Sequence, residues 1–171
     1  MFDLWAPEYS QLREKTFERI FLAELSKTLL LERGMAFEVL RSEFDTSGYD
    51  VVLAAGSVMR HVQLKVTRVG GKRRHVDIHT ALSDQPNGCV VWMMADPDTL
   101  GIGPFYWLGG EPGAPLVVPH NKITRHSKAN ASGVKSERRA LRNVPKSHFH
   151  RYDRVSDIAD ALFGPSQVAR S

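Results

Sequence analysis

One short segment, from His61 to Thr67, alternates apolar and polar residues, and this pattern constrains the fold more than any other part of the chain. Side chains two residues apart on a β-strand point to the same face. Gln63 and Lys65 therefore share one face of the predicted strand. The opposite face carries only apolar side chains, which we expect to lie in a core: Val62, Leu64 and Val66.

An acidic residue, Asp50, follows a glycine-containing turn and begins a second apolar run, 51–53. If the two runs pair as neighbouring strands, the Asp50 carboxylate can lie close to Gln63 and Lys65. A carboxylate, an amide oxygen and an ammonium group held together suit a metal-assisted attack on a phosphodiester. Each of the three residues is also common in turns or on solvent-facing strands, so this chemistry depends on their being brought together.

Length and composition predict one globular domain spanning residues 1–171, with 42% hydrophobic and 25% charged residues. No apolar run approaches the roughly 20 residues of a membrane span. The single Cys89 excludes an intrachain disulfide and a zinc site built on several cysteines. The first residues are acidic and do not form a signal peptide, so we expect a cytoplasmic protein that does not engage a membrane.

Positive charge is concentrated in a basic segment at about 119–154, which holds ten Lys or Arg against two acids, a net charge of about +8. Such a segment is the expected footprint of a polyanion, although a solvated basic surface is the alternative. A second basic group follows Gly70 and Gly71. The candidate nucleic-acid-binding residues are Arg73, Arg74, Arg125, Lys128, Arg138, Arg139, Arg142 and Lys146.

Hydrophobic spacing predicts a helix, then several strands, then a short helix. The first helix runs over 7–33, with Pro7 in its first turn and Gly34 as its stop. Ser156 is the expected cap of the last helix, which ends at Gly164. The stretch 121–150 has no clear periodicity. The predicted strands are 37–40, 49–54, 61–67, 75–80, 89–94 and 105–108, giving an α/β fold with a central mixed sheet flanked by helices.

This order of a helix, an Asp-bearing hairpin and a Gln-x-Lys strand resembles the PD-(D/E)xK nuclease superfamily, which has the restriction-endonuclease-like fold. The motif residues here are Asp50 and Gln63-Leu64-Lys65, and the glutamine resembles the Mrr-like variant. The resemblance covers roughly residues 15–95. It implies a single-domain nuclease that uses Mg²⁺ or Mn²⁺ to hydrolyse phosphodiester bonds in DNA.

The resemblance also implies roles for these residues. Asp50, the Gln63 amide oxygen and the Leu64 backbone carbonyl are the expected metal ligands. Lys65 is expected to assist the attacking water and offset transition-state charge. Gln63 in place of an acid removes one negative charge, so metal binding should be weaker. A catalytically silent fold that binds nucleic acid or protein is the alternative, and a homodimer is one way to supply two active sites.

Two glutamates of the first helix, Glu24 and Glu18, compete for the remaining position in the site. Glu24 is preferred because it falls within an apolar stripe that includes Ile20 and Leu31, where an isolated carboxylate needs a partner. Glu18 lies nearer the edge of this stripe. Asp45 is a further candidate ligand, although a turn residue is the more natural interpretation.

Overall fold

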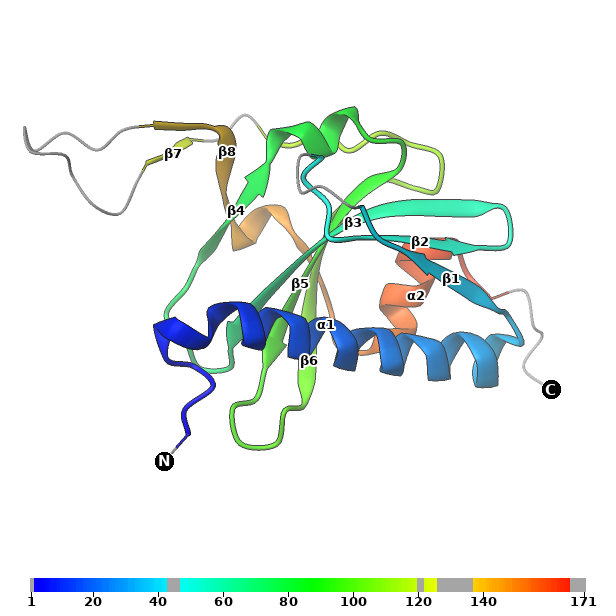
Figure 1. Ribbon diagram of the computed structural model, residues 1–171. Coiled ribbons are helices and arrows are strands. Elements are labelled where there is room, and N and C mark those ends of the chain that lie inside the picture. The colour runs from blue at the N-terminus through cyan, green and yellow to red at the C-terminus, as the bar shows by residue number, and fades with distance from the viewer. Residues whose placement is uncertain (1, 43–46, 120–121, 126–136, 167–171) are drawn as a thin grey trace, which may run out of the picture.

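The computed structural model describes residues 2–42, 47–119, 122–125 and 137–166 (Figure 1). The helical elements are η1 (Pro7–Tyr9), α1 (Ser10–Lys27), η2 (Thr28–Glu32), η3 (Thr80–Asp84), η4 (Lys146–His148) and α2 (Val155–Phe163). The strands are β1 (Phe37–Leu40), β2 (Val51–Ala55), β3 (Val58–Arg68), β4 (His75–His79), β5 (Gly88–Ala95), β6 (Ile102–Gly109), β7 (Ile123–Arg125), β8 (Glu137–Pro145) and β9 (His150–Tyr152).

The strands form a six-stranded mixed sheet and a smaller three-stranded sheet. In the first the order is β1-β2-β3-β5-β6-β9, and in the second it is β4-β8-β7. The central strands β3 and β5 are parallel, and every other neighbouring pair is antiparallel. The chain crosses from β3 to β5 through β4 and η3, so one strand of the second sheet lies within this connection. The predicted α/β fold with a central mixed sheet is confirmed.

Different layers cover the two faces of the large sheet. Both α1 and α2 pack on one face, against residues such as Val62, Val91 and Phe105. The opposite face, with Val90 and Trp92 of β5, packs against β4, β8 and η3. The prediction of helices flanking the sheet is therefore wrong for one face, because a second sheet covers it. The predicted alternation of β3 is confirmed, since its three apolar residues lie against the helical layer.

Helix α1 follows from the apolar spacing of its sequence. Phe17, Phe21 and Leu25 are fully buried, and the same stripe continues into Leu29 in the π-helical turn η2. Gly34 has a φ of 60° and ends the helix, as predicted. Neither α1 nor any other helix of the described chain is both long and apolar enough for a bilayer crossing.

The second sheet is the main element that the sequence pattern did not predict. It includes β8, which pairs with β4 near its C-terminal end and with β7 near its N-terminal end. Figure 1 shows the β7–β8 end extending away from the main body. The basic, irregular composition of 121–150 hides these strands, because few of their residues are apolar.

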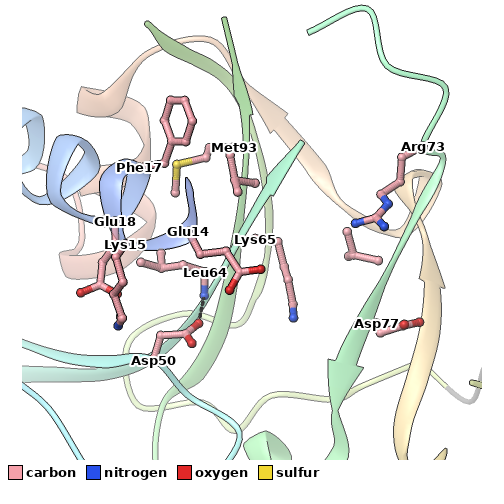
Figure 2. A pocket seen from close by; sticks show the side chains of 12 residues that line it. Glu14, Lys15, Phe17, Glu18, Asp50, Leu64, Lys65, Arg73, Asp77 and Met93 are labelled. Carbon is pink, nitrogen blue, oxygen red and sulfur yellow. Dashed lines mark hydrogen bonds and ion pairs between the residues drawn. The ribbon is translucent and has the colours of Figure 1, made fainter. Parts of the chain in front are cut away.

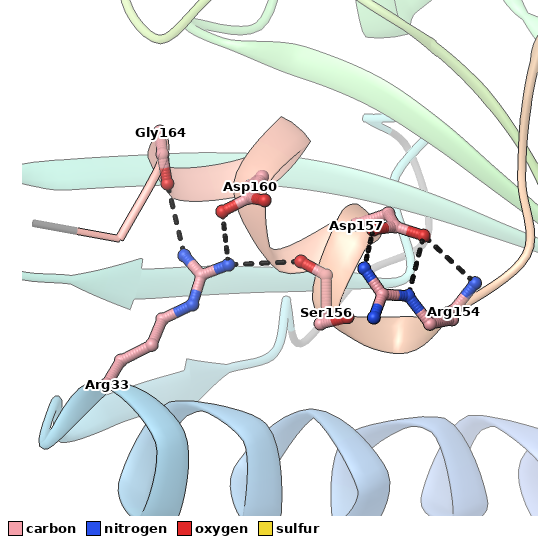
Figure 3. Close-up of polar contacts among 6 residues, drawn as sticks. All are labelled: Arg33, Arg154, Ser156, Asp157, Asp160 and Gly164. Atoms are coloured by element: carbon pink, nitrogen blue, oxygen red, sulfur yellow. Dashed lines mark hydrogen bonds and ion pairs between the residues drawn. The ribbon is translucent and has the colours of Figure 1, made fainter. Parts of the chain in front are cut away.

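Helix α2 begins differently from the prediction. Arg154, not Ser156, is its N-cap residue, and the Asp157 carboxylate accepts hydrogen bonds from the Arg154 backbone N–H and guanidinium (Figure 3). An acid in the first turn also interacts favourably with the helix dipole. Asp157 thereby satisfies the N-cap backbone N–H, as the acidic residue of a capping box does.

Arg33 joins the C-terminal end of the first helical segment to α2. Arg33, whose side chain is 5% exposed, donates to the Ser156 and Gly164 carbonyls and pairs with Asp160 at 2.6 Å (Figure 3). These bonds fix the end of the first helix against α2, on the same face of the large sheet.

A second arginine, Arg60, is fully buried inside the helical face of the sheet. It continues the inward-facing series of β3, and its guanidinium donates to backbone carbonyls of Leu162, Ala161 and Gly110 at 2.8–3.0 Å. Two of these carbonyls belong to the last turn of α2, where a cation is favourable. Arg60 therefore connects β3, α2 and the end of β6.

Replacing Arg60 should be strongly destabilising because three buried or partly buried carbonyls would lose their donor and the fully buried side chain would leave a cavity. We expect Arg60→Ala to lower the free energy of unfolding by about 3 kcal/mol or more. Urea denaturation followed by circular dichroism measures this loss. The exposed Arg68→Ala, on the same strand, should change stability by less than about 0.5 kcal/mol. Equal stability of both variants would show that the buried guanidinium does not hold α2 in place.

Candidate functional site

Four of the predicted catalytic or metal-ligand residues, Glu18, Asp50, Leu64 and Lys65, line a hollow of about 220 Å³ between α1, the start of β2, the C-terminal half of β3 and β4 (Figure 2). Its walls carry charges of both signs. The acidic lining residues are Glu14, Glu18, Asp50 and Asp77, and the basic ones are Lys15, Lys65 and Arg73. Apolar side chains form the rest of the surface: Phe17, Leu64, Val66, Val76 and Met93.

Asp50 lies where β2 stops pairing with β3. Its backbone N–H donates to the Val62 carbonyl at 2.9 Å, and its Oδ2 accepts the Leu64 backbone N–H at 2.6 Å (Figure 2). The side chain therefore replaces the next backbone acceptor that β2 would have supplied. Beyond this point the edge of β3 faces the hollow.

The pKa of Asp50 is raised, chiefly because protein surrounds the carboxylate and removes part of its hydration. The Leu64 hydrogen bond and the Lys65 charge act in the opposite direction, and the Glu18 charge raises the pKa further. Asp50 is still reached by solvent from the hollow. It is therefore an accessible carboxylate whose negative charge is only partly compensated.

Glu18 is the helix carboxylate that lines the hollow, and the residue is only 5% exposed. Its Oε2 pairs with Lys15 and its Oε1 with Arg41, both at 2.8 Å. Burial alone would raise its pKa, but the hydrogen bonds and charges of the two cations outweigh this effect, so the pKa is lowered. Glu18 is thus ionised and held in place.

Glu24, the preferred helix residue, does not line the hollow. Its side chain is 42% exposed and pairs with Lys27 at 2.7 Å. The preference for Glu24 is wrong because Leu31, a member of the predicted apolar stripe, is 82% exposed. The buried stripe continues from Leu25 to Leu29, and Glu18, next to Phe17 in this stripe, is the glutamate that is buried.

Gln63 shares a strand face with Lys65, as predicted, but it is not among the residues that line the hollow. It is buried under the second sheet, where its Oε1 accepts a 3.4 Å hydrogen bond from the His79 backbone N–H. The sequence did not predict that β4 covers this part of β3. In this arrangement the amide oxygen stabilises the contact between the sheets.

Lys65 extends from β3 into the hollow and lies between Asp50 and Asp77 in the view of Figure 2. Arg73, from the basic loop before β4, lies on the opposite wall. Asp77 accepts hydrogen bonds from Thr124 and Asn143 at 2.8 and 3.0 Å, so neutral donors from the second sheet hold it. The hollow therefore has cations on both of its long walls.

Three charged residues of this hollow, Glu14, Lys15 and Asp77, were not predicted from the sequence. Glu14 and Glu18 are four residues apart, so they occupy the same helix face, and choosing Glu18 would have included Glu14. Asp77 alternates with the buried Val76 and Ile78, which places it on the open side of β4. No signal in the sequence alone indicated that this strand faces the site.

The predicted nucleic-acid-binding residues occupy several places. Arg73 lines the hollow and Arg74 is exposed beside it. Lys146 lies in η4, and Arg139 and Arg142 lie on β8, where Arg142 donates to carbonyls of its own strand. Arg125 and Arg138 belong to β7 and β8, whereas Lys128 and the candidate ligand Asp45 lie outside the described residues.

The donor types suit a hard cation such as Mg²⁺ in part. Asp50 and Glu18 line the same hollow, and the negative charge of Glu18 raises the pKa of Asp50. Within the described ranges, however, no three Asp, Glu, His or Cys side chains gather into a metal-binding group. A metal would rest on two carboxylates and backbone or solvent oxygens.

Comparisons with known proteins do not place the chain in a family: no family model matches it, and no curated protein matches it.

The raised pKa of Asp50 makes a prediction about stability. Since its folded-state pKa lies above the unfolded value of about 3.9, the protonated acid favours folding, and this contribution is lost as pH rises through the folded pKa. Asp50→Asn keeps an acceptor for Leu64 without the charge. We expect its Tm to exceed that of the wild type at pH 7 and to match it near pH 3.

Thermal unfolding at the two pH values measures this difference. Asp98→Asn, on an exposed loop, is the matched control and should show no such pH-dependent gain. An Asp50→Asn variant that loses the same Tm at both pH values would mean that the carboxylate charge is well accommodated.

Proposed function

We propose that the chain is a divalent-metal-dependent nuclease of the PD-(D/E)xK type that hydrolyses phosphodiester bonds in DNA. The observation that carries this proposal is the convergence of Asp50, Glu18 and Lys65 on one accessible hollow. These residues come from the three elements that the motif requires, namely the hairpin, the preceding helix and the following strand.

In this proposal, Asp50 and Glu18 hold Mg²⁺ or Mn²⁺. The Leu64 carbonyl is a further candidate ligand, because the N–H and C=O of one strand residue point to the same edge and its N–H already points to Asp50. The bound ion would lower the pKa of a water molecule and polarise a phosphoryl oxygen. Gln63 is left out of the ligand set, since its oxygen is directed to His79.

The protein side chains position the substrate and compensate its charge. Lys65 lies beside Asp50, where it can orient the attacking water and stabilise negative charge on the phosphoryl oxygens. Arg73, on the facing wall, can bind the same or an adjacent phosphate. Lys15 and Arg41 hold Glu18 at the hollow, while the Leu64 N–H holds Asp50, and a metal on Glu18 would displace one of its two cations.

A second candidate is a catalytically silent fold that binds nucleic acid. The observation that favours it is the charge pairing of Glu18, because both of its oxygens already have cationic partners. Together with the burial of Gln63, this pairing leaves Asp50 as the main unpaired anion of the motif. Such a site would attract phosphate through Lys65 and Arg73 without activating water.

The two candidates are separated by cleavage assays on plasmid, linear duplex and single-stranded DNA with Mg²⁺ or Mn²⁺. For the nuclease, we expect Lys65→Ala to reduce the cleavage rate by at least about 10²-fold, because it loses a charge-stabilising donor. Chelation with EDTA should abolish cleavage altogether. The variant should keep the wild-type Tm, since Lys65 is partly exposed.

Lys27→Ala is the matched control, because this lysine pairs with Glu24 on the exposed side of α1, away from the hollow. Cleavage by Lys65→Ala at the wild-type rate contradicts the assigned site. If the wild type cuts none of these substrates but binds them in a salt-dependent way, the silent binding fold is the correct alternative.

A further inference from the structure

A single row of side chains crosses four adjacent strands of the large sheet, starting in the hollow. Lys65 on β3 is the partner of Trp92 on β5, Trp92 is the partner of Tyr106 on β6, and Tyr106 is the partner of Arg151 on β9. Side chains directly opposite one another share a face. The row thus has a cation at each end and spans three strand spacings, about 14 Å.

A third cation lies over the middle of this row. The Lys146 ammonium is 4.7 Å from the centre of the Trp92 ring and 4.4 Å from that of Tyr106. Trp92 is fully buried and Lys146 is partly exposed, so the ring forms a floor with the ammonium on its solvent side. Contact with aromatic faces holds the ammonium in this position.

Arg74 completes a cluster of three cations with Lys146 and Arg151. Its backbone carbonyl accepts the Lys146 N–H at 2.8 Å. Loss of hydration lowers the pKa of Lys146, and the charges of Arg74 and Arg151 lower it further. Within the described part of the chain, neither Lys146 nor Arg74 forms a salt bridge, and Arg151 has only an exposed pairing with Asp153.

The charges of Arg74 and Arg151 both disfavour the charged form of Lys146, so a bound anion would stabilise this cluster. A phosphate satisfies several of them at once and is the natural ligand for such a group. Because the row begins at Lys65 in the hollow, a polynucleotide with one phosphate at the hollow can place its following phosphates along the row. A buried floor excludes stacking of bases on Trp92, so the contacts would be to the backbone.

We propose that Arg74, Lys146 and Arg151 form a phosphate-binding track for the DNA strand on one side of the bond held in the hollow. This inference rests on the proposed nucleic-acid partner, and it adds the path of the strand across β5, β6 and β9. Contacts of this kind are independent of base sequence.

The test is binding without metal. Fluorescence anisotropy is measured with a labelled 20-nucleotide dT strand and a labelled 20-base-pair duplex, in EDTA, over a range of NaCl concentrations. Arg151→Ala removes an exposed side chain that is outside the hollow, so folding should be unaffected. We expect about 5–10-fold weaker binding at 0.1 M salt, and a salt slope of the duplex affinity that is shallower by about 0.9.

Arg74→Ala should have a similar effect. In the double variant, the decrease in salt slope should be about twice that of either single variant. Arg19→Ala is the charge-matched control, since it is exposed on α1, which covers the opposite face of the sheet. The fold decrease in affinity of Arg19→Ala should be less than half that of Arg151→Ala.

If Arg151→Ala and Arg74→Ala bind DNA with the same affinity and salt slope as the wild type, the proposed track is wrong. It is also wrong if the wild type does not bind DNA at low salt. Titration with inorganic phosphate separates a free-phosphate site from a polynucleotide path. If these variants weaken only the binding of inorganic phosphate, the track is wrong. The binding assay contains EDTA and no metal, so its result does not depend on whether the protein is a nuclease. Conversely, cleavage can be observed even if the proposed track is wrong.

Discussion

The Leu64 backbone N–H needs an acceptor at the point where β2 stops pairing with β3, and Asp50 supplies it at 2.6 Å. This bond to a side chain takes the place of the backbone bond that further pairing with β2 would supply, so it marks where the two strands separate. The separation leaves one edge of β3 open to α1 and to the second sheet. Every other feature of the hollow follows from that open edge, which places Lys65, Glu18 and Arg73 around the same space.

The hollow combines one charge that is well compensated with one that is not. Lys15 and Arg41 lower the pKa of Glu18, whereas partial burial and the nearby Glu18 raise that of Asp50. A cation would relieve this repulsion and favour the ionised form of both groups. The buried Arg60 shows the contrasting use of charge, because its Nε and one terminal nitrogen donate to backbone carbonyls and connect α2 to the sheet.

The sequence predicted the parts of this site that follow from local spacing. The alternation of β3 correctly separated the face of Lys65 from that of Leu64. It could not choose between Glu18 and Glu24, because helical spacing does not reveal that Leu31 faces solvent. Nor could it reveal the burial of Gln63, which depends on a second sheet whose strands are too polar to recognise. Arg60 lies two residues before Val62, so the alternation of β3 does indicate that its side chain points inward.

The metal site proposed for Asp50 and Glu18 is tested most directly by a crystal structure grown with Mn²⁺, whose anomalous scattering identifies the ion. We predict a peak about 2.0–2.6 Å from carboxylate oxygens of both residues, the range for hard cations, with Lys15 or Arg41 displaced from Glu18. A hollow without a peak at saturating Mn²⁺, with both ion pairs of Glu18 intact, would contradict the proposal.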